Sequence, residues 1–372
     1  MDKPLAGVKV LELARILAGP WAGQLLADLG ADVIKIERPG TGDDTRQWGP
    51  PFAADGAAAY FHACNRGKKS VALDLAAPEG QEAVRRLAAE ADVLIENFKV
   101  GGLARYGLDY SALSALNPGL VYCSITGFGQ DGPYALRAGY DFVVQAMGGA
   151  MSLTGEPDGA PQKSGVAYAD LFTGLYASVA ILAALRARDR SGRGAHLDLA
   201  LLDTQVAVLA NQALSWMVSG EVPHRMGNGH AALVPYQAFG AADGELIVAV
   251  GNDRQFERLC GVLGLPDLAR DPRFATNPAR VEHRAALLPL IETAIAPRAC
   301  GELSEALEAA GIPAGPVNAV DAVFADPQVV HRGLRLDGGV PGLASPIVID
   351  GRRQAAAAGG PALGAGPGRF ED

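Results

Sequence analysis

The segment Val8–Glu37, VKVLELARILAGPWAGQLLADLGADVIKIE, decides the fold class of this 372-residue chain. Its two ends, Val8–Leu13 and Asp32–Glu37, are short, apolar and rich in β-branched residues, which is typical of buried strands. Between them, Trp21–Leu29 has apolar residues at helical spacing and follows Gly19-Pro20, which favours a helix start. We therefore expect two parallel strands joined by a crossover helix.

The same alternation continues through the first 200 residues. It predicts an α/β fold with a mainly parallel sheet and helices on both faces. Further strands are expected at Ser70–Leu75, Asp92–Asn97, Leu120–Thr126 and His196–Leu199, with a helix at Pro78–Ala91. Because ligands of such sheets bind beyond the carboxyl ends of the strands, the residues that follow those ends are site candidates. They are Arg38, Asn97-Phe98 and Gly127-Phe128-Gly129.

The chain is long enough for two domains, each with its own core. A long helical pattern at Leu201–Val218 leads into a stretch rich in Gly and Pro, and a new α/β pattern then begins with Gln237–Phe239 and Glu245–Val250. We expect a large α/β domain at 1–200, a linker at 201–227, a smaller α/β domain at 228–325, and a return to the large domain with an irregular tail at 326–372.

Composition excludes several classes of protein. The net charge of −9 argues against a general nucleic-acid binder. The four cysteines are widely spaced without a CxxC pair or a metal pattern, which fits a reducing compartment. The N-terminus lacks the features of a signal peptide, and the longest apolar run near Asp170 has 15 residues, fewer than the roughly 18 that a membrane span needs. We expect a soluble cytoplasmic protein without a metal and without a GxGxxG or P-loop fingerprint.

Asp170 is the single charged residue between Ser164 and Leu185. The run Leu171–Leu185 is apolar or small on every face and predicts a buried helix with Asp170 at its N-terminal end. Two interpretations follow from these residues. The carboxylate either caps the helix, or it is a nucleophile that the helix dipole holds ionised at the mouth of a cleft.

Three cationic segments could meet an anion: Arg38, the basic loop Asn65–Ser70 (NRGKKS) and Arg105. A guanidinium matches phosphate oxygens bidentately, although each segment is also explained as a solvated loop charge. If the three lie at one edge of the predicted sheet, they would form an anion site. His230, in GNGHAALVPYQ, is interpreted as a polar loop residue.

A series of segments between residue 4 and about residue 334 resembles the class III CoA-transferases, which include formyl-CoA:oxalate, succinyl-CoA:dicarboxylate and L-carnitine CoA-transferases. The segments are PLAGVKVLELARILAGPWAGQLLADLGADVIKIERPGTGDDTR, NRGKKSVALDL, ADVLIENFKVGGLARYGLDY, SITGFGQDGP, AGYDFVVQAMGG, the run that holds Asp170, and GIPAGPVNAV with DPQVVHRGL.

The resemblance implies a Rossmann-like large domain built from both chain ends, a small domain and an interlocked homodimer. Asp170 matches the family's catalytic aspartate, which favours the nucleophile over the helix cap. Residues that match CoA-binding positions are Arg38, Leu73, Asp74, Leu75, Asn97, Phe98, Arg105, Tyr140 and Asp141.

Two departures from the family pattern bear on the substrate. Leu17 stands where formyl-CoA transferases carry a glutamine, and GNDRQF (Gly251–Phe256) replaces their longer glycine-rich loop. Both favour succinyl-CoA and a small dicarboxylic acid, such as itaconate, mesaconate, citramalate, malate or glutarate, over formyl-CoA and oxalate. The chain also stops after LGAGPG where relatives continue into a helix. Further substrate-site candidates are Arg46, Arg225, His230, Gly251 and Asn252, the last two as donors to an oxyanion.

The implied mechanism is acyl exchange through an aspartyl anhydride and an aspartyl-CoA thioester, with CoA esters as substrates and no other cofactor. The alternatives are formyl-CoA:oxalate transfer, an acyl-CoA racemase and a non-catalytic CoA-binding regulator. Racemases of this fold use a histidine in the segment that here reads AGYDF. Tyr140 takes that place, and an unperturbed tyrosine, with a pKa of about 10, is a poor base at neutral pH.

Overall fold

The computed structural model describes residues 3–371, which divide into two compact units. The first unit contains the chain up to Met151, Lys163–Glu221 and the chain from Pro327 onward. The second contains Ser152–Gln162 and Val222–Asp326. This division differs from the expected linker at 201–227, because most of that segment forms two helices that belong to the first unit. The expected single helix there is broken at Val208-Leu209.

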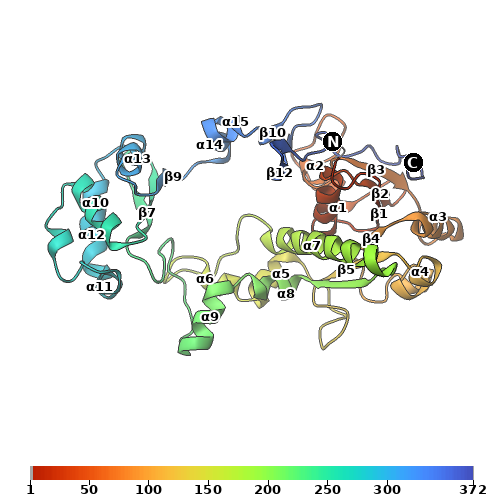
Figure 1. Ribbon diagram of the computed structural model, residues 1–372, viewed down its shortest axis with the longest axis horizontal. Coiled ribbons are helices and arrows are strands. Elements are labelled where there is room, and N and C mark those ends of the chain that lie inside the picture. Colours follow the sequence, from red (N-terminus) through yellow and green to blue (C-terminus); the bar gives the residue numbers. More distant parts are fainter. Residues whose placement is uncertain (1–2, 372) are drawn as a thin grey trace. The chain divides into compact units, whose positions relative to one another are not determined.

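The first unit is built on a six-stranded sheet with strand order β3-β2-β1-β4-β5-β6 (Figure 1). All neighbouring strands are parallel, as the sequence predicted. The strands are β1 (Lys9–Glu12), β2 (Asp32–Glu37), β3 (Lys68–Ala72), β4 (Val93–Glu96), β5 (Val121–Thr126) and β6 (His196–Ala200). The α/β fold class is therefore confirmed.

The order of the strands reverses between β1 and β4, which are neighbours although β2 and β3 lie between them in sequence. The chain leaves β1 toward one side of the sheet and leaves β4 toward the other. The loops that follow these two strands therefore diverge and open a crevice at their carboxyl ends. This topology fixes the place of the site before any side chain is considered.

Helices cover both faces of this sheet because successive strand residues point to opposite sides. Val10 lies in the core beneath α1 and α7, whereas its neighbour Leu11 lies in the core beneath α3 and α4. The helices of the first unit are α1 (Ala18–Asp28), α2 (Ala59–Ala63), α3 (Pro78–Glu90), α4 (Tyr110–Leu116), α5 (Asp141–Met147), α7 (Tyr168–Ser191), α8 (Leu201–Ala207), α9 (Ala210–Ser219) and α15 (Pro327–His331), and α6 (Ala150–Leu153) spans the boundary between the units.

Helix α7 differs from the buried helix that its sequence predicted. One face packs on α1 and the sheet through Ala177 and Ile181, while the opposite face is exposed. Phe172, Leu175, Tyr176 and Val179, which recur at helical spacing, are 42%, 46%, 46% and 57% exposed. Within residues 3–371, α7 is also the one helix whose length and composition would allow it to cross a membrane, although its other face packs on α1 and the sheet.

The C-terminal segment returns to the first unit and covers the edge strand β3. The Gly366 N–H donates to the Ser70 carbonyl at 2.6 Å, and the Gly364 N–H donates to the Ser70 hydroxyl at 3.0 Å. Phe370 is buried beside the strands, so the exposed edge of β3 is closed by this segment. Before it lie two short hairpins, β10 (Arg335–Leu336) with β11 (Gly342–Leu343) and β12 (Val348–Ile349) with β13 (Arg352–Arg353).

The second unit has an antiparallel sheet in the order β7-β8-β9 and its own apolar core. Its strands are β7 (Tyr236–Gly240), β8 (Glu245–Ala249) and β9 (Ala314–Pro316), and its helices are α10 (Asp253–Leu263), α11 (Asn277–Glu282), α12 (Arg284–Ile295), α13 (Cys300–Ala309) and α14 (Val320–Ala325).

Candidate active site

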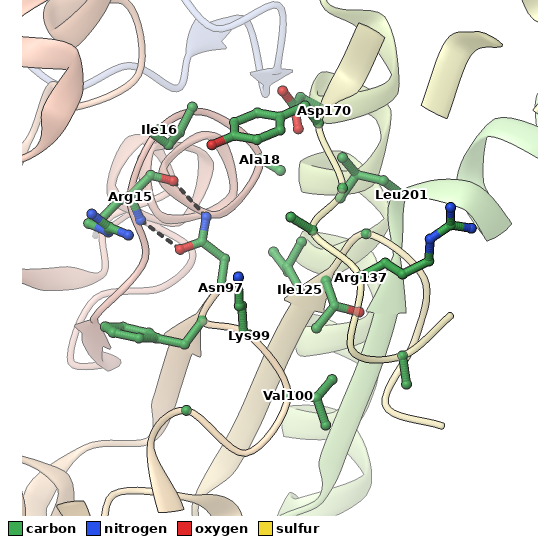
Figure 2. A pocket seen from close by; sticks show the side chains of 18 of the residues that line it. Arg15, Ile16, Ala18, Asn97, Lys99, Val100, Ile125, Arg137, Asp170 and Leu201 are labelled. Atoms are coloured by element: carbon green, nitrogen blue, oxygen red, sulfur yellow. Dashed lines mark hydrogen bonds between the residues drawn. The ribbon is translucent and has the colours of Figure 1, made fainter. Parts of the chain in front are cut away.

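A cavity of about 510 Å³ opens in the first unit at the crevice between the ends of β1 and β4 (Figure 2). The loops after β1, β4 and β5 supply most of its wall, and Asp170 reaches it from the first turn of α7. Its lining includes Arg15, Ile16, Leu17, Ala18, Asn97, Phe98, Lys99, Val100, Arg105, Ile125, Thr126, Arg137, Tyr140, Asp170 and Leu201.

The loop after β1 is held to the loop after β4 by one amide side chain. The Arg15 N–H donates to Asn97 Oδ1 at 2.9 Å, and Asn97 Nδ2 donates to the Arg15 carbonyl at 2.7 Å (Figure 2). The next residue, Ile16, has a φ of 71°, which is strained for a β-branched side chain. Its N–H points to both carboxylate oxygens of Asp43 at 3.3 Å, so two side chains fix this conformation.

A buried ionic cluster, formed by Glu12, Lys35, Asp43 and Lys68, supports the same loop. Lys35 Nζ lies 2.9 Å from Glu12 and 3.0 Å from Asp43, and it donates to the Ala14 carbonyl at 2.7 Å. Lys68 Nζ lies 2.8 Å from Glu12. Burial opposes the charge on Lys35, but the carboxylates outweigh it and raise its pKa above the ordinary value.

The basic loop Asn65–Ser70 is therefore structural, and its interpretation as a phosphate site is wrong. Arg66 pairs with Asp28, Lys68 with Glu12 and Lys69 with Asp32. All three cations are taken by carboxylates of the protein itself, so none is free for a ligand. The sequence could not reveal this, because each partner lies more than 30 residues away along the chain.

Other cations do line the cavity. Lys99, Arg105 and Arg137 make no salt bridge to any residue between 3 and 371. Arg105 lies over the Tyr106 ring at 4.5 Å and Arg137 over the Tyr134 ring at 4.5 Å. Unpaired guanidinium groups at a cavity wall suit a phosphorylated ligand.

Asp170 is the third residue of α7 and does not cap it, since the capping position is Ala167. Asp141, the first residue of α5, accepts the N–H groups of Ala169 at 2.9 Å and of Asp170 at 3.3 Å. The first N–H groups of α7 are thus directed to Asp141, and the expectation that the helix N-terminus holds Asp170 ionised is wrong. Burial, with the nearby Asp141 charge, raises the pKa of Asp170 to about 7.

The structure brings seven of the predicted site residues into this cavity: Leu17, Asn97, Phe98, Arg105, Gly127, Tyr140 and Asp170. Arg38, which directly follows β2, is exposed and does not line the cavity. Leu73, Asp74 and Leu75, which follow β3 at the same edge of the sheet, do not line it either. Asp141 is directed to the first turn of α7 and does not line the cavity.

Arg46 does not fit the expected role of binding a distal carboxylate. Its guanidinium donates to both carboxylate oxygens of Glu37 at 2.7 Å and to the Pro361 carbonyl at 2.9 Å, and it stacks on Phe61. These contacts bury it and occupy its donors, so Arg46 holds the C-terminal segment to the first unit.

The remaining candidates belong to the second unit and have partners there. Arg225 donates to the carbonyls of Glu156 and Gly159. His230 Nδ1 lies 3.0 Å from the N–H of Ala232. The Gly251 N–H donates to Gln255 Oε1 at 2.8 Å, so it is not free for an oxyanion. Asn252 caps α10 with its side-chain oxygen, which accepts the Gln255 N–H at 3.0 Å.

The sequence reasoning missed Arg15, Lys99 and Arg137. Arg15 and Lys99 closely follow the ends of β1 and β4, so the rule that ligands bind beyond strand ends could have found them. Arg137 lies in an irregular loop that carries no local signal.

Comparison with known proteins agrees with this geometry. The chain is 57% identical to the succinate–glutarate CoA-transferase of Agrobacterium fabrum, covering 93% of this chain and 89% of that relative. It is 45% identical to the succinyl-CoA:glutarate CoA-transferase of Mus musculus, covering 90% and 77%. A crystal structure of a CAIB/BAIF family protein from Brucella suis has 57% identity and a TM-score of 0.90, covering 98% of this chain and 97% of that one. The profile of CoA-transferase family III matches residues 5–366. The chain therefore belongs to the class III CoA-transferases.

Proposed function

We propose that this enzyme transfers CoA between succinyl-CoA and glutarate, with Asp170 as the nucleophile. The observation that carries the proposal is a carboxylate in a cavity lined by unpaired cations, at the carboxyl end of a parallel sheet. The relatives from Agrobacterium fabrum and Mus musculus, both named for glutarate, support the choice of acceptor. The reaction is expected in the cytoplasm.

The proposed reaction passes through two covalent enzyme species. An Asp170 carboxylate oxygen attacks the thioester carbonyl carbon of succinyl-CoA, so a C–O bond forms and CoA leaves as thiolate. The thiolate then attacks Cγ of Asp170, which forms an aspartyl-CoA thioester and releases succinate. The glutarate carboxylate repeats the two steps in reverse and leaves as glutaryl-CoA. No bond needs fresh activation, so we expect no requirement for ATP, metal or another cofactor.

Binding of CoA would use the cations at the cavity and the adjoining edge of the sheet. Lys99, Arg105 and Arg137 lie at the wall, where they can meet phosphate oxygens. Arg38 and Leu73–Leu75 follow β2 and β3 at the same edge, so a CoA molecule that extends from Asp170 past β1 would reach them. Leu17 lines the cavity with an apolar side chain that suits the methylene chain of a dicarboxylic acid.

A panel of acceptors tests the substrate assignment. With succinyl-CoA as donor, we expect glutarate to give the highest kcat/KM, followed by itaconate, mesaconate, citramalate and malate, with formation of each acyl-CoA measured by chromatography. We expect an equilibrium constant near one, because a thioester is exchanged for a thioester. Efficient turnover of formyl-CoA with oxalate, and none with succinyl-CoA and glutarate, would contradict the assignment.

We also propose that the enzyme is a homodimer, whose subunits interlock as the family resemblance implies. The support is the apolar stripe of α7 formed by Phe172, Leu175, Tyr176 and Val179, all exposed in the single chain. A contiguous apolar surface on a helix of this length is typical of a buried interface.

We expect Val179→Glu to convert the dimer to a monomer or an aggregate, because it places a charge at the most exposed residue of the apolar stripe. Light scattering after gel filtration would measure the mass against the 38.4 kDa of one chain. Val320→Glu is the matched control, since Val320 is an exposed valine on α14 of the second unit. A Val179→Glu protein of unchanged dimeric mass would place the interface elsewhere.

A further inference from the structure

Asp141 has an unusual set of partners for a residue beside a reaction centre. One oxygen, Oδ1, accepts the N–H groups of Ala169 and Asp170 from the first turn of α7. The other, Oδ2, accepts from Gln145 Nε2 at 2.6 Å. Every one of these contacts is to a neutral donor, and no cation pairs with Asp141 among residues 3–371. Its negative charge is therefore held in place but not neutralised.

The same contacts position Asp170 through its backbone. Helix α7 has no capping side chain of its own, so Asp141 supplies from α5 the acceptor that a capping residue would normally provide. Gln145 extends the support, because its Oε1 accepts the Ser164 N–H at 3.0 Å and its side chain is buried. The segment that leads into α7 and the first turn of α7 are thus fixed to one carboxylate and one amide.

We propose that Asp141 is a positioning residue for the nucleophile: it caps α7 and holds a second carboxylate, without a paired cation, beside Asp170. Repulsion between the two carboxylates opposes loss of the Asp170 proton, so the Asp170 carboxylate is more basic. This inference rests on the proposed role of Asp170. A more basic carboxylate is a stronger nucleophile, and in acyl exchange it forms an anhydride whose energy is closer to that of the thioester.

Other ionisable groups around the two carboxylates do not supply the same effect. Tyr60 on α2 interacts electrostatically with both, and burial with the charges of Asp170 and Asp141 raises its pKa to about 12, so it stays neutral. Burial also raises the pKa of Tyr168 on α7. The cations Arg15, Lys99, Arg105 and Arg137 line the cavity and would favour ionised Asp170, opposing Asp141.

The test is the pH dependence of kcat in Asp141→Asn. Asparagine keeps an oxygen that can accept from α7 but removes the charge. Wild-type kcat should fall as pH decreases through about 7, since the ionised fraction of Asp170 is lost. In Asp141→Asn the fall should move to lower pH by about one unit, and the plateau at high pH should decrease because the nucleophile is weaker. KM for succinyl-CoA should stay within about twofold.

Asp92→Asn is the matched control. Asp92 also accepts a backbone N–H, that of Lys9 at 2.8 Å, and contacts the far end of α7 by pairing with Arg188 at 2.8 Å. Removing that charge should leave the pH profile unchanged. Asp141→Glu keeps the negative charge, so in this variant the acid limb of the profile, which is the fall of kcat at low pH, should lie at the wild-type pH.

Two further results separate the possible failures. If circular dichroism shows that Asp141→Asn is unfolded, Gln145→Leu is tested instead. This variant keeps the charge of Asp141 but removes the hydrogen bond from Gln145 that holds its side chain. It should lower kcat about tenfold through misplacement of Asp170, with an unchanged acid limb and KM. An acid limb at the same pH in wild type and folded Asp141→Asn, or full kcat in Gln145→Leu, would overturn the inference. An active Asp170→Asn protein would instead remove the proposed function beneath it.

Discussion

Replacing Asp170 with asparagine is expected to reduce kcat at least a thousandfold, roughly the loss seen when a covalent nucleophile is removed. The amide has nearly the same shape but cannot form an anhydride with the acyl group. Incubation with succinyl-CoA should give a mass adduct on the wild-type enzyme and none on Asp170→Asn. Affinity for CoA, measured by calorimetry, should change little, because the cations at the cavity wall are untouched.

The fold should tolerate this change well. Asp170 makes no salt bridge among residues 3–371, and its neighbour Asp141 repels it when both are ionised. The variant should therefore unfold at a temperature equal to or above that of the wild type. Intact mass must confirm the asparagine, since deamidation would restore the nucleophile. Turnover within tenfold of wild type by a verified variant would exclude Asp170 as the nucleophile.

The second large effect is expected from Lys35→Met. Lys35 is fully buried, and its loss would leave Asp43 without a cation and Glu12 with Lys68 alone. Removing one partner of such a buried cluster costs about 3–5 kcal/mol, because uncompensated charge remains in the core. The three tryptophans, Trp21, Trp48 and Trp216, all belong to the first unit, so their fluorescence in urea reports its unfolding.

Arg85→Met provides the comparison. It breaks a pair with Glu82 on the surface of α3, which is worth about 1 kcal/mol or less. The urea midpoint should thus fall much further for Lys35→Met. Lys35→Met should also impair catalysis below its midpoint, since Lys35 holds the Ala14 carbonyl just before the strained Ile16. Equal midpoints for the two variants would show that the buried cluster does not stabilise the fold.

The sequence predicted the strands of the large sheet because each is a short apolar segment with local turn signals. It also predicted that the residues following β4 contribute to the site, since strand ends meet at one edge of a parallel sheet. It did not predict the ionic cluster. Lys35 and Lys68 are 23 and 56 residues from Glu12, and nothing local distinguishes a paired buried lysine from a solvated one.

Asp141 shows the same limit at the site. The family resemblance of the segment AGYDF marked Asp141 as a CoA-binding position, but the sequence did not predict which way its side chain points. Whether a carboxylate meets a ligand or a helix terminus depends on where α5 packs against α7, and that packing is set by contacts far apart in sequence. The exposed stripe of α7 has a related cause. Apolar residues on every face indicate burial, but they do not say whether the covering surface belongs to the same chain.

The closure of β3 by the C-terminal segment has a consequence for synthesis of the protein. While the chain emerges from a ribosome, β3 is made early, yet Gly364, Gly366 and Phe370 are made only after the whole second unit, Gly364 being 294 residues beyond Ser70. The second unit, whose core is its own, can pack before they do. The first unit is therefore the first of the two to be synthesised but the last to be completed. In the interval, the unpaired edge of β3 can bind other nascent chains.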